Sequence, residues 1–320
     1  MTNPDVLIIG GGLAGLTAAH FLLEKGWNSI VLDKGRGPGG RMSTRHAGEA
    51  RFDHGAQFFS TKTTDFQIFI KKAEIAGVVK KWTPAHLEDA HPRWVGSQGM
   101  NSLPKFLTQN LNVFTGQKAI RLAPQSNGWK VFTESGHEFS AGALIVTIPS
   151  PQALDLLKNS GLELPETFDA LQQIEYLPCL AVLARTDKPS LLPSPGSLAP
   201  DNQAIIWIAD NFQKGISPVP AITIHASPAF SQEHLEGDLQ ATGTKLLELA
   251  TPYLGDVQVL DFQIHRWRYS LPYKRFPGPF FKTETDDLPL LFGGDGFGQG
   301  NVEGAFLSGL EMSRFFSKKS

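Results

Sequence analysis

A short apolar run, a cluster of glycines and a helical pattern follow one another at the start of the chain. Val6–Ile9 is apolar without alternation, which is typical of a strand buried on both faces. Gly10–Gly15 (GGGLAG) form a turn, and Leu16–Lys25 continue at helical spacing. A second apolar run, Asn28–Asp33, ends in a carboxylate. This order predicts a βαβ unit of the Rossmann type, and with it an α/β fold.

The glycines of this turn match the pattern G-x-G-x-x-G. Gly10 permits a tight turn, Gly12 lets the backbone approach a diphosphate, and Gly15 lets the helix pack closely on the strand. The diphosphate then lies against the free N–H groups of the helix. Asp33 stands at the distance expected of a carboxylate that binds the ribose of adenosine, and its charge disfavours NADP. The pattern predicts an adenine dinucleotide, with NAD and FAD both open at this point.

Composition excludes several classes of protein. The chain has 320 residues, 41% hydrophobic and 19% charged, which predicts a globular protein of two domains or one large one. A net charge of −2 predicts no nucleic-acid partner. Cys179 is the only cysteine and the nine histidines show no metal-ligand spacing, so we expect no disulfide within the chain and no metal site. The N-terminus MTNPD carries no basic residue, which favours a cytoplasmic protein without a signal peptide.

The remaining chain alternates strand-like and helix-like segments. Helices are expected at about 65–77, 233–250 and 301–316, and strands at 111–114, 129–133, 143–148, 180–185, 204–209, 221–226 and 290–292. The helix at 305–316 is apolar around much of its circumference, so we expect it to pack inside the protein and predict no membrane association.

Two further glycine-rich segments need an explanation. Residues 33–42 (DKGRGPGGRM) place Gly39, Gly40 and Arg41 just after the βαβ unit, where glycines allow close approach and arginine offers donors. Near the other end, Gly293-Gly294-Asp295 ends a strand, and Asn301 opens a helix. Two strand-to-helix turns at opposite ends of one chain predict a single elongated cofactor, FAD, that spans both.

Several stretches resemble the FAD-dependent amine-oxidase superfamily: GGGLAGLTAA, DKGRGPGGRMSTR, FDHGAQFF, ALIVTIPSPQ and GGDGFGQGNVEGA. Within it, GGRMSTR, WIADNFQKG, TIHASPAFSQEHLE and HRWRYS resemble the renalase-like branch. The resemblance implies a Rossmann-type FAD-binding domain (residues 1–60, 96–150 and 276–320). This domain is interleaved with a substrate domain on a mixed β-sheet (residues 61–95 and 151–275).

The resemblance also implies how the cofactor is held. The residues it places at the cofactor are Gly10, Gly12, Leu13, Ala14, Gly15, Asp33, Lys34, Gly40, Arg41, Met42, Gln57, Lys118, Ala119, Asp295, Asn301 and Val302. Monoamine oxidases attach flavin through a cysteine of the C-terminal half, which this chain lacks, so FAD is expected to be non-covalent. They also carry a tyrosine where this chain has Asn301, and that difference disfavours a typical amine substrate.

The renalase-like branch is associated with oxidation of dihydronicotinamide isomers. The resemblance therefore implies an FAD-dependent oxidase or dehydrogenase. A hydride passes from a small reduced nicotinamide-type substrate to flavin N5, and dioxygen reoxidises the flavin to give hydrogen peroxide. The aromatic product makes hydride loss favourable, so no strong protein base is required.

Candidate catalytic residues are Gln57, His225, Arg266 and Tyr269, with His54, Trp207 and Trp267 as further pocket residues. Each also fits a structural position. His225 is equally well interpreted as a hydrogen-bonded core histidine, Trp207 as a core residue, and 266–269 as one strand with alternating faces.

Three other functions stay open. A flavin-dependent amine oxidase would have the same fold, a flavin-free NAD dehydrogenase would leave the C-terminal glycine turn unused, and a non-catalytic flavin-binding redox sensor would bind FAD without turnover. A monomer or weak dimer is expected.

Overall fold

The computed structural model describes residues 4–83, 92–283 and 288–319. The chain forms two compact units, each built from separate stretches of sequence. The Rossmann unit contains residues 1–40, 104–175 and 272–320, and the second unit contains residues 41–103 and 176–271. These divisions differ from the predicted boundaries. Residues 41–60 and 96–103 belong to the second unit, whereas residues 151–175 and 272–275 belong to the Rossmann unit.

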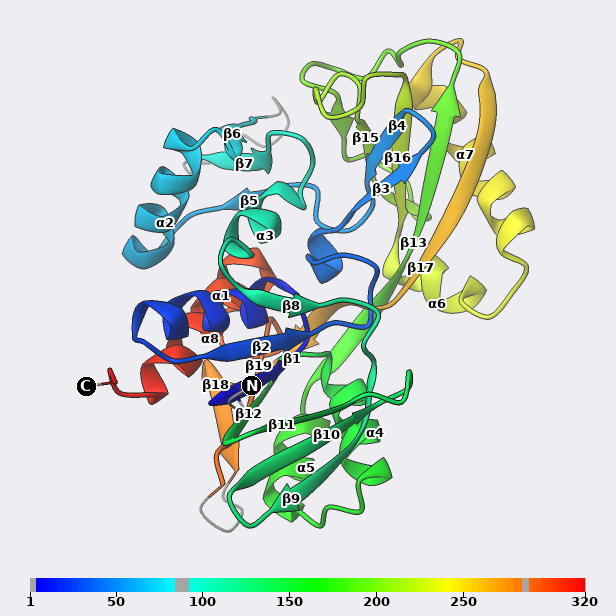
Figure 1. The fold of residues 1–320 in the computed structure, drawn as a ribbon. Helices are drawn as coiled ribbons and strands as arrows, with labels where there is room; N and C mark the ends of the chain where they lie inside the picture. Colours follow the sequence, from blue (N-terminus) through cyan, green and yellow to red (C-terminus); the bar gives the residue numbers. More distant parts are fainter. Residues whose placement is uncertain (1–3, 84–91, 284–287, 320) are drawn as a thin grey trace. The chain divides into compact units, whose positions relative to one another are not determined.

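The Rossmann unit is built on a six-stranded sheet with the order β18-β19-β12-β1-β2-β8 (Figure 1). Its strands are β1 (Val6–Ile9), β2 (Ser29–Leu32), β8 (Asn112–Phe114), β12 (Ala143–Val146), β18 (Phe280–Thr283) and β19 (Leu290–Gly293). All neighbours are parallel except the β18–β19 pair. The four central strands are buried along their whole length, as their unbroken apolar runs predict. The predicted Rossmann-type α/β fold of this unit is confirmed.

Helices and a small antiparallel sheet complete this unit. The helices are α1 (Leu13–Glu24), α4 (Ser150–Asn159), α5 (Pro165–Gln172) and α8 (Asn301–Phe315), with α3 (Ser102–Leu107) at the division of the units. The small sheet consists of β9 (Ala119–Gln125), β10 (Gly128–Thr133) and β11 (Glu138–Ala141). Helices α1 and α8, from opposite ends of the chain, lie side by side in Figure 1 and pack tightly.

The two strand-to-helix glycine turns open at the same edge of the sheet. One follows β1 and the other follows β19, and β12 lies between these strands and is parallel to both. Since neighbouring strands are about 4.8 Å apart, the two turns start about 10 Å from each other. This edge holds the carboxyl ends of the parallel strands, where ligands bind in open α/β sheets.

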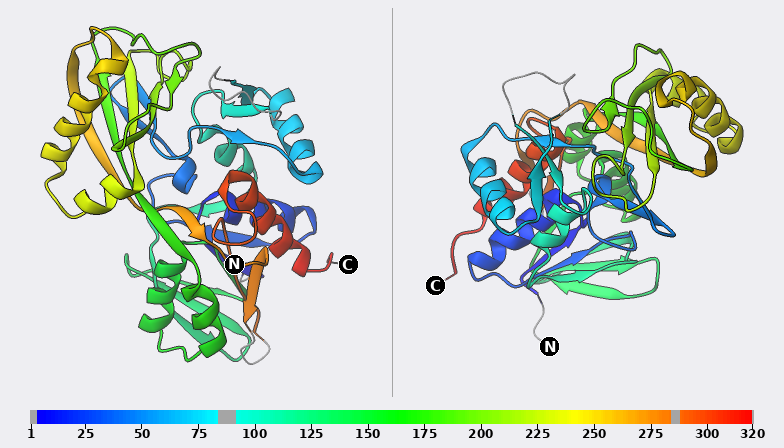
Figure 2. Two further views of the ribbon diagram at one scale, coloured as in Figure 1. Left: turned by 180° about the vertical axis from the view of Figure 1, so that it is seen from behind. Right: turned by 90° about the horizontal axis from the view of Figure 1, so that it is seen from above.

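The second unit is built on a five-stranded sheet with the order β14-β15-β16-β13-β17. Its strands are β13 (Glu175–Thr186), β14 (Ser197–Leu198), β15 (Ile205–Asp210), β16 (Ala221–Ala226) and β17 (Val259–Lys274). Helices α6 (Pro228–His234) and α7 (Leu239–Leu254) cover one face, and the hairpin of β3 (Thr44–Ala47) and β4 (Ala50–Asp53) covers the other (Figure 2). A smaller part comprises β5 (Phe59–Ser60), α2 (Thr64–Ile75), β6 (Val79–Lys81) and β7 (Arg93–Gly96).

The predicted single helix at 233–250 is wrong. The chain forms α6 and α7 instead, and the break falls at Gly237 and Asp238. The Asp238 carboxylate accepts hydrogen bonds from the N–H groups of Gln240 and Ala241 and so starts a new helix.

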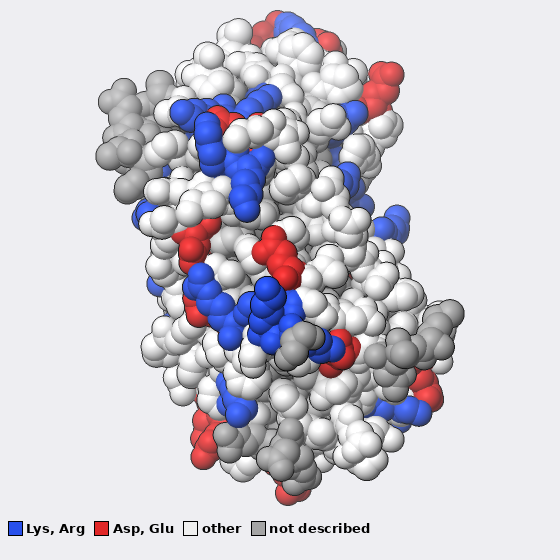
Figure 3. All heavy atoms as spheres, turned by 60° about the vertical axis from the view of Figure 1, so that its left-hand side comes forward, with Lys and Arg blue, Asp and Glu red and all other residues white. Residues whose placement is uncertain are grey.

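On the face drawn in Figure 3, lysine and arginine side chains lie in groups with acidic side chains beside them. Among the described residues, no helix combines the length and the apolar character needed to cross a bilayer.

Gly309 permits the close contact of α8 with α1, and this gives a test of the packing. A Cβ at position 309 would lie 2.2 Å from the Ala14 carbonyl oxygen and 2.8 Å from Thr17 Cβ, so the helices would have to separate. We expect Gly309→Ala to lower the free energy of unfolding of the apoprotein by about 1–3 kcal/mol, although alanine is the better helix former. Chemical denaturation measures the change. Gly304→Ala on the same helix is the control, because no atom lies within 3.0 Å of its Cβ. Equal stabilities of the two variants would contradict the packing argument.

Candidate functional site

The first glycine turn has the geometry that a diphosphate needs. A Cβ at Gly15 would lie 2.0 Å from the Gly10 carbonyl oxygen, so only glycine lets α1 start so close to β1. Gly10 has a φ of +115°, in a region that favours glycine. A Cβ at Gly12, by contrast, would meet nothing within 4 Å. The backbone at Gly12 is thus open on the side where the N-terminus of α1 begins, with Leu13 and Ala14 buried behind it.

The Asp33 carboxylate holds this turn in place through hydrogen bonds to backbone N–H groups. One carboxylate oxygen accepts a hydrogen bond from the Gly11 N–H at 2.6 Å, and the other accepts from the Gly35 N–H at 2.6 Å. Each carboxylate oxygen has a second lone pair, so the side chain still has acceptor capacity for a ribose hydroxyl. Asp33 thus joins the first turn to the second glycine loop, a role that the sequence did not predict.

The second glycine loop runs alongside the first. Gly39 N–H donates to the Gly11 carbonyl at 2.8 Å, and Gly39 and Gly12 form an isolated parallel bridge. A Cβ at Gly40 would lie 3.5 Å from Gly12 Cα. Gly39 and Gly40 thus extend the same glycine-lined surface.

The segment after β8 borders Asp33 on its other side. Gln117 N–H donates to the Asp33 carbonyl at 2.8 Å, and Gly116 N–H donates to the Gly35 carbonyl at 2.9 Å. The side chains expected here point to other partners. Lys118 pairs with Glu134 at 2.8 Å, and Lys34 donates to Gln152 at 2.9 Å. Ala119 begins β9.

The C-terminal turn is fixed by α8. Gly294 N–H donates to Ser308 Oγ at 2.8 Å, and Asp295 follows, partly buried. Asn301 has a φ of +56°, and its side-chain oxygen accepts from Gly304 N–H at 3.3 Å. Asn301 thus helps to start the helix, and Val302 lies half-buried in its first turn.

Arg41 and Met42 belong to the second unit. The Arg41 guanidinium donates to the carbonyls of Tyr269 and Ser270 at 3.3 and 3.4 Å and lies over the Tyr176 ring at 5.6 Å. Met42 is buried.

The second unit contains a cluster of aromatic rings and histidines. The rings of His54 and Trp267 lie 5.1 Å apart at 31°, and His265 meets both edge-on. The His54 carbonyl accepts from Trp267 Nε1 at 2.7 Å and from the His225 ring at 3.1 Å. Trp267 and His265 are partly exposed, whereas His54 is buried. The cluster therefore presents a planar indole held by a backbone carbonyl.

These histidines are neutral near pH 7. Burial, together with the nearby His265, Arg45 and His225, lowers the pKa of His54 to about 3. Burial lowers the pKa of His225 to about 4, and burial with Arg45 lowers the pKa of His265 to about 4. The cluster offers hydrogen bonds and rings, and none of the three side chains gains or loses a proton in the neutral pH range.

Gln57 and His225 lie together in this cluster. Gln57 Nε2 donates to the carbonyls of Asp53 and Gly55 at 2.6 and 3.1 Å and lies 3.5 Å from His225 Nε2. Among the described residues, Gln57 Oε1 is buried without a hydrogen-bond partner.

Arg266 is placed elsewhere. The side chains of β17 alternate, so Arg266 and Arg268 share the face opposite Trp267, and both pair with Glu236. We therefore do not retain Arg266 as a catalytic candidate. Tyr269 packs edge-on against Tyr176, and Trp207 is buried and packs against Phe58.

Sequence reasoning missed the charged pair at the centre of this unit. Lys214 Nζ lies 2.9 Å from Asp53 Oδ2, and both side chains have no exposed surface. Lys214 also donates to the Gln57 carbonyl at 2.6 Å. Burial lowers the pKa of Lys214, and Asp53 opposes that shift. Asp53 stands in the quoted FDHGAQFF stretch, but nothing in the sequence connects it to a lysine so far along the chain.

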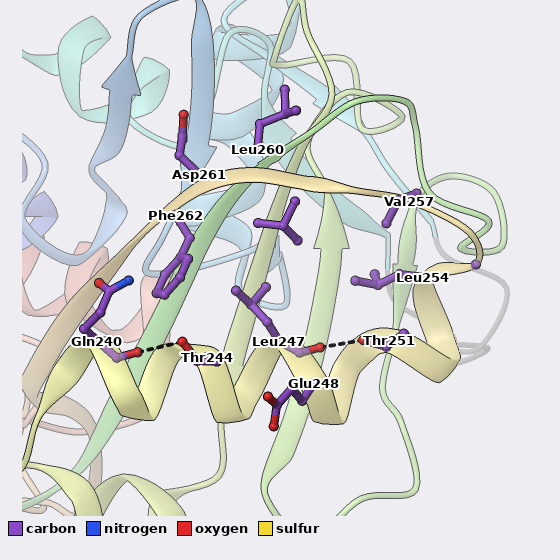
Figure 4. A pocket seen from close by; sticks show the side chains of 12 residues that line it. Gln240, Thr244, Leu247, Glu248, Thr251, Leu254, Val257, Leu260, Asp261 and Phe262 are labelled. Carbon is purple, nitrogen blue, oxygen red and sulfur yellow. Dashed lines mark hydrogen bonds between the residues drawn. The ribbon is translucent and has the colours of Figure 1, made fainter.

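A separate pocket of about 560 Å³ lies between α7 and β17 (Figure 4). Leu247 and Phe262 face each other in it, and the hydroxyls of Thr244 and Thr251 donate to carbonyls of their own helix. Gln240, Glu248 and Asp261 border it as well, so its lining is mixed, and the lining contains no histidine. We take this pocket as a weaker candidate than the histidine cluster. Across residues 4–83, 92–283 and 288–319, no group of three or more His, Cys, Asp or Glu side chains is arranged to hold a metal ion.

Comparison with known proteins agrees with this geometry. Residues 8–72 match the NAD(P)-binding Rossmann-like domain, and residues 85–314 match the family of flavin containing amine oxidoreductases. Renalase of Mus musculus is 24% identical, over 98% of each chain.

Solved structures share the fold at low identity. Cyclohexylamine oxidase from Brevibacterium oxydans IH-35A has a TM-score of 0.75 and 11% identity, with 98% of each chain covered. Putrescine oxidase bound to putrescine has a TM-score of 0.73 and 13% identity, covering 98% of this chain and 99% of that one. The chain belongs to the flavin containing amine oxidoreductase family and is an FAD-dependent oxidoreductase of its renalase-like branch.

Proposed function

We propose that this enzyme oxidises a small dihydronicotinamide-type substrate, with dioxygen as the electron acceptor and hydrogen peroxide as the product. The observation that carries the proposal is the cluster around Trp267. It combines a partly exposed planar ring with histidines that stay neutral near pH 7. A planar substrate ring can stack on the indole. A dihydropyridine that becomes aromatic on losing a hydride needs no protein base, and the cluster provides none that titrates near neutrality.

The Rossmann unit fits FAD on its own geometry. Gly12 leaves open the side of the turn where the diphosphate belongs, and Asp33 keeps acceptor capacity for the ribose. We assign the diphosphate to Gly10, Gly12 and Gly15, and the far part of the cofactor to Asp295 and the first turn of α8. An α-helix N-terminus favours negative charge, so the start of α8 would stabilise the reduced ring.

The bound flavin supplies the acceptor for the substrate hydride and passes the electrons on to dioxygen. The protein binds and orients the substrate. The Trp267 indole offers a stacking surface, and its Nε1–H bond to the His54 carbonyl fixes the plane of that ring. His225 donates to the same carbonyl, which fixes which ring nitrogen carries its proton.

Attachment of FAD is proposed to be non-covalent. Cys179 is the only cysteine of the chain, and burial raises the pKa of its thiol to about 12. A buried thiol that stays protonated is a poor nucleophile for a bond to the flavin ring.

Gly12→Ala tests the cofactor assignment without disturbing the fold. Gly12 has φ −76° and ψ 178°, which alanine adopts readily, and its Cβ would meet no protein atom within 4 Å. We expect unchanged thermal stability of the apoprotein and a loss of FAD affinity of about tenfold or more, because the methyl group occupies the space of the diphosphate. Titration of apoprotein with FAD measures the affinity. Gly237→Ala in the second unit is the control, because its Cβ would meet only the His234 carbonyl oxygen, at 3.6 Å. FAD binding as tight as in the wild type would contradict the assignment.

Anaerobic mixing with substrates tests the proposed reaction. We expect dihydronicotinamide isomers to bleach the flavin absorbance and air to restore it with formation of hydrogen peroxide. A panel of alkylamines should leave the absorbance unchanged. Bleaching by amines but not by any dihydronicotinamide would replace the proposal with amine oxidation.

The pH dependence of the reductive step separates the same two substrates. His54, His225 and His265 have pKa values of about 3 to 4, so all three stay neutral between pH 6 and 8. We expect the rate of flavin reduction by a dihydronicotinamide to vary less than about twofold over this range. An amine must lose the proton of its ammonium group, whose pKa is near that of lysine at ~10, so its rate would rise with pH. Stopped-flow absorbance measures both, and a steep rise with the dihydronicotinamide would show that a protein base is required.

A further inference from the structure

The ammonium group of Lys214 is fully enclosed in the second unit and is not used by the proposed reaction. Lysine is almost never fully buried unless it is paired. Here its side chain and that of Asp53 have 0% exposure, and their charged atoms are 2.9 Å apart. The second contact of the ammonium is with the Gln57 carbonyl, at 2.6 Å. One cation is thus bonded to both ends of residues 53–57.

Asp53 is held in place from its other side. Its Oδ1 accepts from Thr44 Oγ1 at 2.7 Å and from Met100 N–H at 2.8 Å. The backbone of Asp53 is bonded as well, since Thr223 Oγ1 donates to its carbonyl at 3.1 Å. The carboxylate is therefore a fixed anchor for Lys214, and Lys214 fixes Gln57.

Residues 53–57 supply the hydrogen-bond acceptor of the Trp267 indole in the candidate site. His54 lies within this stretch, and the His54 carbonyl accepts the Trp267 Nε1–H bond at 2.7 Å. The Gln57 side chain also restrains this stretch, because its amide nitrogen donates to the carbonyls of Asp53 and Gly55. A shift of residues 53–57 would therefore move the acceptor of the Trp267 hydrogen bond.

We propose that Lys214 is a positioning residue, which acts through residues 53–57 to hold the His54 carbonyl and so the plane of the Trp267 ring. The part of this inference that concerns substrate binding rests on the proposed function. Stability alone does not explain why these two groups are charged. A buried ion pair adds little to the stability of a fold compared with well-packed apolar side chains of similar volume. The hydrogen bond from Lys214 to the Gln57 carbonyl lets the ion pair also fix the position of residues 53–57.

The position of the Trp267 ring can be observed without any substrate. The chain has six tryptophans, so the indole N–H signals of the FAD-loaded protein form a small set in a ¹⁵N-labelled NMR spectrum, and Trp267→Phe identifies the signal of Trp267. In Lys214→Met we expect that signal to shift and its hydrogen exchange to become about tenfold faster or more. Because this variant leaves the Asp53 carboxylate buried without its cation, the double variant Asp53→Asn with Lys214→Met is measured beside it. It lacks both charges and also the bond to Gln57, so the same change is expected.

Ser231→Ala is the matched control. Ser231 is fully buried in α6 of the same unit, and its hydroxyl accepts from Leu180 N–H at 3.0 Å, with no bond to residues 53–57. This variant should lose stability and leave the Trp267 signal unchanged. An unchanged signal in both Lys214 variants, or an equal change in Ser231→Ala, overturns the positioning role.

Kinetics of the same variants test the link to substrate. We expect KM for a dihydronicotinamide to rise about tenfold in the Lys214 variants with kcat changed less than about threefold, because the indole binds the substrate ring similarly before and during hydride loss. Ser231→Ala should keep both values. A shifted Trp267 signal with unchanged KM overturns the link to substrate. If no dihydronicotinamide reduces the wild-type flavin, the proposed function fails, and the NMR result still decides whether Lys214 positions Trp267.

Discussion

The parallel register of β1, β12 and β19 is the constraint on which the Rossmann unit depends. It brings the turn at residues 10–12 and the turn at residues 294–300 to the same edge of one sheet. A cofactor that extends from one turn toward the other needs contributions from both ends of the chain. The close packing of α1 on α8, which Gly309 permits, fixes the two helices that begin at these turns. Cofactor binding and the closure of the fold are therefore expected to be coupled.

The first half of this arrangement could be predicted from sequence because its causes are local. A strand without alternation, glycines at fixed spacing and a carboxylate after the second strand each act within about thirty residues. The strands β1 and β2 lie where the patterns placed them, whereas α1 begins at Leu13, three residues before the expected start at Leu16. The second glycine loop was harder to interpret. Its position beside Gly11 and Gly12 follows from a backbone hydrogen bond of Gly39, which no residue pattern encodes. Gly39 and Gly40 have φ angles of +127° and +54°, in a region that favours glycine, and this is the reason for glycine at these two positions.

Features of the second unit that depend on contacts between residues far apart in the sequence could not be predicted. Lys214 and Asp53 are separated by 161 positions, and a lysine in isolation predicts an exposed side chain. The ion pair of Arg266 with Glu236 could not be predicted for a different reason. The sequence shows that residues 266–269 alternate between the two faces of a strand. It does not show that the face with Arg266 and Arg268 is bound to Glu236. The break between α6 and α7 had a local cause in Gly237 and Asp238, and it was missed because the leucines on either side keep helical spacing.

The candidate site gains its properties from backbone carbonyls more than from ionised side chains. The carbonyls of Asp53, His54, Gly55 and Gln57 each accept a hydrogen bond from a side chain, and these donors come from residues 57, 214, 223, 225 and 267. Neutral histidines are suited to such a network, because a protonated ring would be a buried charge without a partner carboxylate. The low pKa values of His54, His225 and His265 are thus a consequence of how the ring surface is built. Under the proposed function, such a site orients the planar substrate and leaves the electron transfer to the cofactor.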